Sequence, residues 1–183
     1  MSDRSDYEWI QLVDGTPFWP LDAHPSEIRV EPIAHALSHL CRFAGHTREF
    51  YSVAEHSVYV SLFCEPADAL AGLLHDASEA FLVDVPRPVK HSPALAGYRT
   101  IERQLEAVIA EAFGLATLTP PSVKVADERM LATEARDLMA KPQRPWGALD
   151  AKPLPMRLVR TWTPRVARER FLARFAELTK GAA

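Results

Sequence analysis

Apolar residues recur at helical spacing along most of this 183-residue chain, and this periodicity is the strongest constraint on its fold. The clearest stripe ends at Gly114 and consists of Ile101, Leu105, Val108, Ile109, Ala112 and Phe113. Two further stripes follow Pro32 and Pro164, and proline is suited to a first helical turn. The periodicity therefore predicts an all-α fold.

Three more helices are expected between these stripes. One spans residues 52–64, and a second begins near Pro66 and runs to Leu82 in one piece. The third follows Ser122, whose hydroxyl can cap a helix, and carries Val125 on its apolar side.

A departure from helix is expected near the N-terminus. Residues 8–20, EWIQLVDGTPFWP, place β-favouring residues on both sides of Asp14-Gly15. This dipeptide favours the positive φ angles of a two-residue hairpin turn. We therefore expect a small N-terminal β-hairpin.

The chain length fits one domain with a substantial core, so residues 1–183 are predicted to form a single domain. Its helical core should span about residues 31–140. A proline-rich loop is expected at 141–163, followed by a C-terminal helix at 164–180.

Composition and charge exclude several classes of protein. The net charge is -3, so no overall basic field attracts a nucleic-acid polymer. The polar N-terminus MSDRSDYEWI is unlike a secretory signal, and no apolar run approaches the ~18 residues that span a bilayer. Cys41 and Cys64 form neither a CxxC motif nor a disulfide ladder, which favours a reducing compartment. We expect a cytoplasmic protein without membrane partners, and a homo-oligomer.

The segment GLLHDASEAFLVDVPRPVK, residues 72–90, places three ionisable side chains within a predicted apolar helix. Glu79 follows His75 by four residues and Asp76 by three, so all three can lean toward one patch of the helix surface. One interpretation is a metal site, and the other is an amphipathic helix with a solvated polar edge. The His-Asp pair alone does not decide, because such pairs also arise by chance.

Two residues on other predicted helices could complete a metal site. His56 lies in YSVAEHSVYVS, and Asp127 lies in SVKVADERML. Together with His75 and Asp76 they would offer two nitrogens and two carboxylates, a set that suits Mn, Co, Fe, Ni or Zn. The alternatives are a core histidine bonded to a carbonyl and a first-turn acid favoured by the helix dipole.

These motifs resemble the HD-domain metal-dependent phosphohydrolases, whose pattern is H…HD…D across helices. The chain looks most like the small branch with 5′-deoxynucleotidases and deoxynucleoside triphosphohydrolases, including dATP triphosphohydrolase-like proteins. The matching stretches are CRFAGHTREFYSVAEHSV, LLHDASEAFLVDVPRPVK and VKVADERML. The resemblance covers about residues 31–137 and implies a helical HD-domain bundle.

The resemblance also implies a role for each matching residue. The implied ligands of a divalent ion (Mn, Co, Zn, Fe, Ni or Mg) are His56, His75, Asp76 and Asp127. Glu79 would handle the proton of the attacking water, and Asp84 would lie near the leaving phosphoester. The implied contacts to phosphate and to base or sugar are Arg42, Phe43, Lys90 and Lys124. Glu134, seven residues after Asp127, is a candidate to support a ligand from behind.

A nucleotide is the implied substrate, and two reactions remain open. A 5′-mononucleotidase would release phosphate from a dNMP, whereas a triphosphohydrolase would release triphosphate from a dNTP. A non-catalytic nucleotide sensor with a vestigial site is the alternative function, and the complete ligand set together with Glu79 argues against it. The P-loop pattern GxxxxGK[ST] is absent from the sequence.

Overall fold

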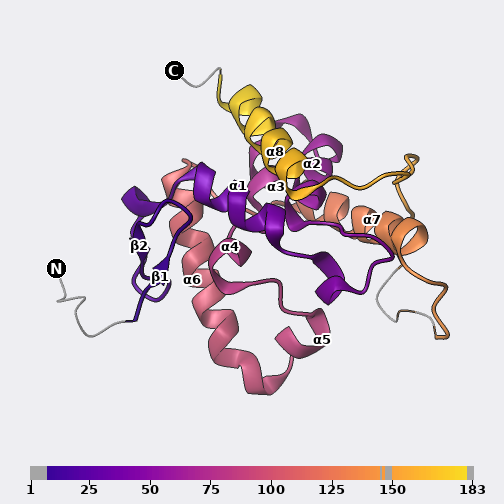
Figure 1. The fold of residues 1–183 in the computed structure, drawn as a ribbon, viewed down its shortest axis with the longest axis horizontal. Helices are drawn as coiled ribbons and strands as arrows, with labels where there is room; N and C mark the ends of the chain where they lie inside the picture. The colour runs from indigo at the N-terminus through magenta and orange to yellow at the C-terminus, as the bar shows by residue number, and fades with distance from the viewer. Residues whose placement is uncertain (1–7, 145, 147–149, 181–183) are drawn as a thin grey trace.

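The computed structural model describes residues 8–144, 146 and 150–180. Residues 1–7 of the polar N-terminus, residues 145 and 147–149 of the proline-rich loop, and residues 181–183 lie outside the described residues. The chain is mostly helical, with one small antiparallel hairpin at its N-terminal end (Figure 1), so the predicted all-α class is confirmed. No helix within the described residues is both long and apolar enough to cross a membrane.

The helices cover most of the chain between residues 30 and 179. Their bounds are α1 Val30–His39, α2 Val53–Phe63, α3 Ala69–Leu74, α4 Glu79–Leu82, α5 Arg87–Lys90, α6 Ala96–Ala112, α7 Pro121–Leu138 and α8 Pro164–Thr179. Short 3-10 turns lie at Pro25–Glu27, Arg42–Gly45, Pro66–Asp68 and Pro93–Leu95.

The N-terminal hairpin pairs β1 (Ile10–Gln11) with β2 (Pro17–Phe18), as predicted. The expected two-residue turn is wrong, because only Gly15 of the Asp14-Gly15 pair has a positive φ, 85°. The loop therefore contains three residues and closes where the Leu12 N–H donates to the Thr16 carbonyl at 2.8 Å.

Helix α2 lies at the centre of the fold and contacts α1, α3, α7 and α8. Its first turn is capped by Ser52, whose Oγ accepts a hydrogen bond from the Glu55 N–H at 3.1 Å. Residues on nearly every side of α2 are buried, which is typical of a helix enclosed by other helices. This enclosure leaves the His56 side chain with no exposed surface.

The predicted continuous helix over residues 66–82 is wrong. The chain forms a 3-10 turn, then α3, then a tight turn at residues 75–78, and then α4. In and after that turn, the N–H groups of Ala77, Glu79 and Ala80 donate to carbonyls three residues earlier, which winds the chain more tightly than an α-helix. His75 and Asp76 therefore lie in the turn between two short helices.

Two details of α7 also differ from expectation. Pro120, and not Ser122, occupies the capping position, because the Ser122 hydroxyl donates to the Asp68 carboxylate beside α3. The Val125 side chain is 57% exposed, so it does not belong to the buried side of α7.

The segment between α7 and α8 is irregular over its described residues, as predicted, but it is anchored to α7. The Leu154 N–H donates to Thr133 Oγ1 at 2.8 Å, and the Leu154 side chain is buried. Helix α8 begins at Pro164 as expected, with Thr163 as its cap. The segment thus closes over α7 and leads the chain back to α2, which α8 contacts.

Candidate metal centre

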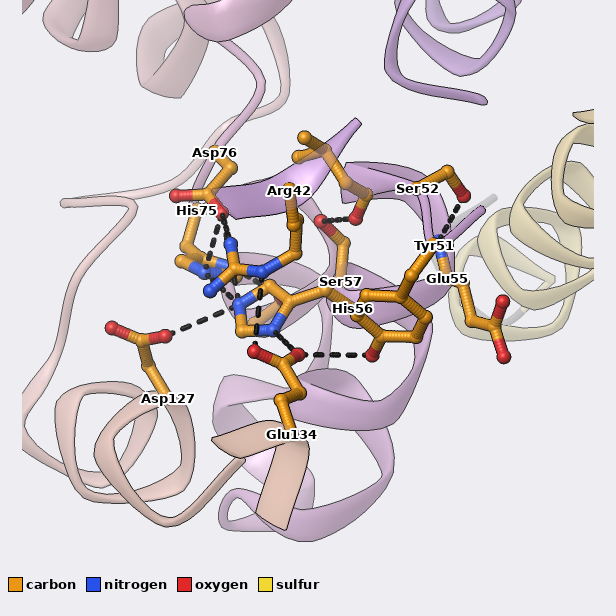
Figure 2. Close-up of polar contacts among 12 residues, drawn as sticks. Arg42, Tyr51, Ser52, Glu55, His56, Ser57, His75, Asp76, Asp127 and Glu134 are labelled. Atoms are coloured by element: carbon orange, nitrogen blue, oxygen red, sulfur yellow. Dashed lines mark hydrogen bonds and ion pairs between the residues drawn. The ribbon is translucent and has the colours of Figure 1, made fainter. Parts of the chain in front are cut away.

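Three of the four predicted metal ligands meet in one cluster (Figure 2). His56 comes from the N-terminal part of α2, and His75 and Asp76 come from the turn that follows α3. One nitrogen or oxygen of each residue lies within 4.8 Å of the others, so these side chains could hold a metal ion. The fourth predicted ligand, Asp127 on α7, brings its Oδ1 to 3.1 Å from His56 Nε2.

The spacing inside this cluster matches that of atoms bound to one ion. The two Nε2 atoms of His56 and His75 lie 3.2 Å apart, and His75 Nε2 lies 3.2 Å from Asp76 Oδ2. Ligand atoms bound ~2.0–2.1 Å from a divalent ion, at tetrahedral or octahedral angles, stand roughly 3 Å apart. A cation between the two nitrogens therefore fits the observed geometry.

Both imidazole rings are held from behind. The Nδ1–H of His75 donates to the Gly72 carbonyl oxygen at 2.8 Å, and His56 Nδ1 bonds Glu134 Oε1 at 2.6 Å. Because a carbonyl oxygen only accepts, the Nδ1 of His75 carries a hydrogen, and Nε2 is the nitrogen left to bind a metal. This arrangement is how metal-binding histidines are usually oriented.

Glu134 is the central support of the cluster. It has no exposed surface, and it accepts hydrogen bonds from His56 Nδ1, from the Tyr51 hydroxyl at 2.9 Å and from Arg42 Nε at 3.2 Å. Its position agrees with the supporting role expected from the sequence. The contact of Tyr51 with Glu134 was not predicted, because the position of Tyr51 before Ser52, the cap of α2, does not indicate a partner on α7.

Arg42 lies between two carboxylates. In addition to its bond to Glu134, its Nη1 lies 3.3 Å from Asp76 Oδ2, and only 12% of its side chain is exposed. These bonds use two of the five N–H donors of the guanidinium group. Arg42 therefore supports a candidate metal ligand, whereas the resemblance implied only a contact to phosphate.

Phe43 is presented by a strained backbone. Phe43 and Ala44 both adopt left-handed conformations, with φ of 54° and 50°, and each costs ~1–2 kcal/mol in a residue other than glycine. The Phe43 ring lies 5.6 Å from the Arg42 guanidinium and 6.0 Å from the ring of Trp146. The predicted Arg42–Phe43 pair is therefore held together next to the cluster.

The two predicted proton-handling groups are partly or wholly withdrawn from solvent. Burial raises the pKa of Glu79 well above its usual value, and the nearby carboxylates of Asp76 and Asp84 raise it further. Glu79 Oε2 has no hydrogen-bond partner among the described residues. Burial also raises the pKa of Asp84. Carboxyl groups perturbed in this way can exchange protons closer to neutral pH.

The two predicted lysines differ in their surroundings. Lys90, at the end of α5, forms an ion pair of 2.6 Å with Glu102 on α6, and its charge acts on Glu79. Lys124 is exposed on α7, one turn before Asp127, and forms no ion pair within the described part of the chain. The structure thus places Lys90 near the predicted acids, whereas Lys124 remains at the surface.

The charges of the cluster favour a cation. Burial lowers the pKa of His56, but the carboxylates of Glu134 and Asp127 outweigh this effect and raise it to about 9. Burial raises the pKa of Asp76, yet His75, His56 and Arg42 together hold it far below its usual range. The Asp127 side chain is 42% exposed, whereas His56 is fully buried, so the cluster opens to solvent on the α7 side.

Two proteins are similar to this chain over nearly their whole lengths. The sequence is 38% identical over 173 residues to the uncharacterized protein YfdR of Escherichia coli strain K12, covering 94% of this chain and 96% of that protein. It is 32% identical over 183 residues to the uncharacterized protein RCAP_rcc00048 of Rhodobacter capsulatus, and the match covers 91% of this chain and 93% of that protein. Neither name states an activity, and no protein-family model matches the chain.

Proposed function

The chain belongs to the same protein family as E. coli YfdR and R. capsulatus RCAP_rcc00048, and we propose that it is an HD-domain, metal-dependent phosphohydrolase of deoxynucleotides. The reaction is hydrolysis of the 5′-phosphoester of a dNMP or release of triphosphate from a dNTP. One observation carries the proposal. Two imidazole Nε2 atoms lie 3.2 Å apart beside the Asp76 carboxylate, and both rings are fixed from behind.

The proposed ligands of the ion are His56, His75, Asp76 and Asp127. This mixed nitrogen and oxygen set suits Mn, Co, Zn, Fe or Ni better than Mg, which prefers oxygen ligands and retains its waters. A divalent ion bound there supplies a more acidic water and a positive charge that polarises a phosphoryl oxygen.

The remaining steps fall to side chains of the protein. In its ionised form, the buried carboxyl of Glu79 accepts the proton of the attacking water, and its raised pKa makes this carboxylate a stronger base than that of an ordinary glutamate. Asp84 relays a proton toward the leaving oxygen. Arg42 holds Asp76 in place and has further N–H donors with which to bind a phosphate oxygen.

The test is a panel of dNMPs and dNTPs incubated with Mn, Co, Zn or Mg, with products separated by chromatography. Turnover by the wild-type protein that is lost in a His75→Ala, Asp76→Ala double variant supports the proposal. Release of phosphate identifies a mononucleotidase, and release of triphosphate identifies a triphosphohydrolase. Binding of nucleotides without turnover of any of them would instead favour the non-catalytic sensor.

A further inference from the structure

Val83 has a backbone conformation that side-chain-bearing residues avoid. Its φ is 63° and its ψ is 159°, a region that glycine occupies almost exclusively and that is least tolerated by β-branched residues. Its side chain is 55% exposed, so burial of the isopropyl group does not compensate for the strain. Some contact of the backbone must therefore hold Val83 in this conformation.

The Val83 N–H donates to the Glu79 carbonyl of α4 at 2.9 Å, and the contact to its carbonyl comes from Tyr98, in the first turn of α6. The Tyr98 hydroxyl lies 3.3 Å from the Leu82 carbonyl oxygen and 3.2 Å from the Val83 carbonyl oxygen, and these two acceptors share its single hydrogen. Burial and the charge of Glu102 raise the pKa of Tyr98 to about 12, so the phenol keeps its proton throughout the neutral range. The carbonyl of the strained residue is thus fixed by a donor from another helix.

The same helix also holds the far end of this segment. Arg99 Nη1 donates to the Lys90 carbonyl at 2.6 Å and to the Ser92 carbonyl at 2.8 Å. Figure 1 shows the chain passing from α4 through α5 before it enters the first turn of α6. Helix α6 therefore fixes the segment between Val83 and Lys90 at both ends.

Asp84 is the residue whose position depends most directly on Val83. The φ and ψ angles of Val83 together set the direction in which the chain leaves α4, and Asp84 is the next residue. The charges of Arg42, Asp76 and His56 act on the Asp84 carboxyl, so this carboxyl lies within electrostatic range of the cluster. In the relaxed β or α conformation of a valine, the chain would leave α4 in a different direction.

We propose that Tyr98 is a positioning residue for Asp84: its hydroxyl holds Val83 in the strained conformation, and this conformation presents the Asp84 carboxyl to the cluster of His56, His75 and Asp76. The inference rests on the proposed function, in which Asp84 relays a proton to the leaving oxygen. The Tyr98 hydroxyl bonds the backbone carbonyls of residues 82 and 83 and acts through them.

The first test is Tyr98→Phe, which removes only the hydroxyl. We expect kcat on the substrate found in the nucleotide panel to fall roughly 3- to 10-fold, the factor that corresponds to about one intramolecular hydrogen bond. The metal content should stay unchanged, because Asp84 is not a proposed ligand. Wild-type kcat in a folded Tyr98→Phe variant would overturn the proposal.

Rescue distinguishes positioning from a general structural role. Adding Val83→Gly to Tyr98→Phe should restore most of kcat, because glycine adopts this φ and ψ without strain. Adding Val83→Ala is the matched control, since alanine also truncates the exposed side chain but keeps the strain, and it should not rescue. Equal kcat values for the two double variants would overturn the proposal.

If Tyr98→Phe does not fold, the single variants at position 83 decide. Val83→Gly should then have a Tm at least equal to that of Val83→Ala, the reverse of the usual order of these residues, and it should keep wild-type kcat. A higher Tm for Val83→Ala would show that Val83 is not strained and would overturn the inference. Absence of turnover by the wild type itself would overturn the proposed function, and this inference with it.

Discussion

Replacement of Glu134 by glutamine tests the support of the cluster most sharply, because the change preserves size and removes only a charge and one acceptor. In the wild type, Glu134 Oε1 accepts hydrogen bonds from His56 and Tyr51, and Oε2 accepts one from Arg42. If the glutamine carbonyl oxygen takes the place of Oε1, its NH2 group takes the place of Oε2 and faces Arg42 Nε, so two donors face each other. The opposite orientation leaves both His56 and Tyr51 without an acceptor.

The expected cost follows from these contacts. Removing one partner of a buried ion pair costs ~3–5 kcal/mol, and the lower end applies because Arg42 still contacts Asp76. At ~2–4 °C per kcal/mol for a chain of this size, ~3 kcal/mol lowers Tm by ~6–12 °C. The loss of the carboxylate behind His56 should also weaken metal binding by ~10- to 100-fold.

Both quantities can be measured separately. Thermal unfolding of the apoprotein in chelator gives Tm without the contribution of a bound ion, and titration calorimetry with Mn²⁺ gives the metal Kd. Tyr51→Phe is the matched control, because it removes one donor to Glu134 but leaves the charge and the contact to His56. It should lower Tm less and leave the Kd close to that of the wild type. An unchanged Tm and Kd in Glu134→Gln would refute this account of the site.

Three further outcomes are expected. Glu79→Gln should keep its metal but lose ~10²–10⁴-fold in kcat, and a loss of only a few-fold would make Glu79 a spectator. Burial raises the pKa of Glu55 in the folded protein to about 8, whereas the usual value is about 4.5. The folded state therefore holds the proton more tightly than the unfolded state, and the stability from this difference, which is complete below about pH 4.5, is lost as the pH rises to about 8. The Glu55→Gln carbonyl can still accept from the Trp162 N–H. The Tm of this variant minus that of the wild type should therefore increase from about pH 5 to about pH 9, and a constant difference would contradict this prediction. Deoxynucleotides should be preferred over matched ribonucleotides by ~5- to 150-fold in kcat/KM, because Phe43 offers a 2′-hydroxyl no partner, and equal values would exclude a sugar-selective pocket.

The helical class and the hairpin could be predicted from the sequence, because each depends on local spacing. The stripe that ends at Gly114 became α6, and Thr163-Pro164 opened α8. The grouping of His56 with His75 and Asp76 was also predicted, although it needed the resemblance as well as the spacing. The cytoplasmic location and the homo-oligomer stay predictions.

The features that could not be predicted depend on contacts between distant residues. Helical periodicity does not distinguish a continuous helix from two short ones joined by a tight turn, so the break at His75 was missed. The charge of Arg42 suggested a phosphate contact, but its neighbours Glu134 and Asp76 became evident only in three dimensions. Nothing in the sequence near Val83 indicated a positive φ, because glycine is the residue that normally signals one.

The most direct test of the central claim is the rate of nucleotide hydrolysis by metal-free protein as Mn²⁺ is added in measured amounts. The rate should rise in proportion to bound metal and stop rising at about one ion per chain. Asp76→Ala should neither bind the ion with comparable affinity nor gain activity. Full turnover in the presence of chelator, or an ion bound as tightly by Asp76→Ala as by the wild type, would contradict the claim.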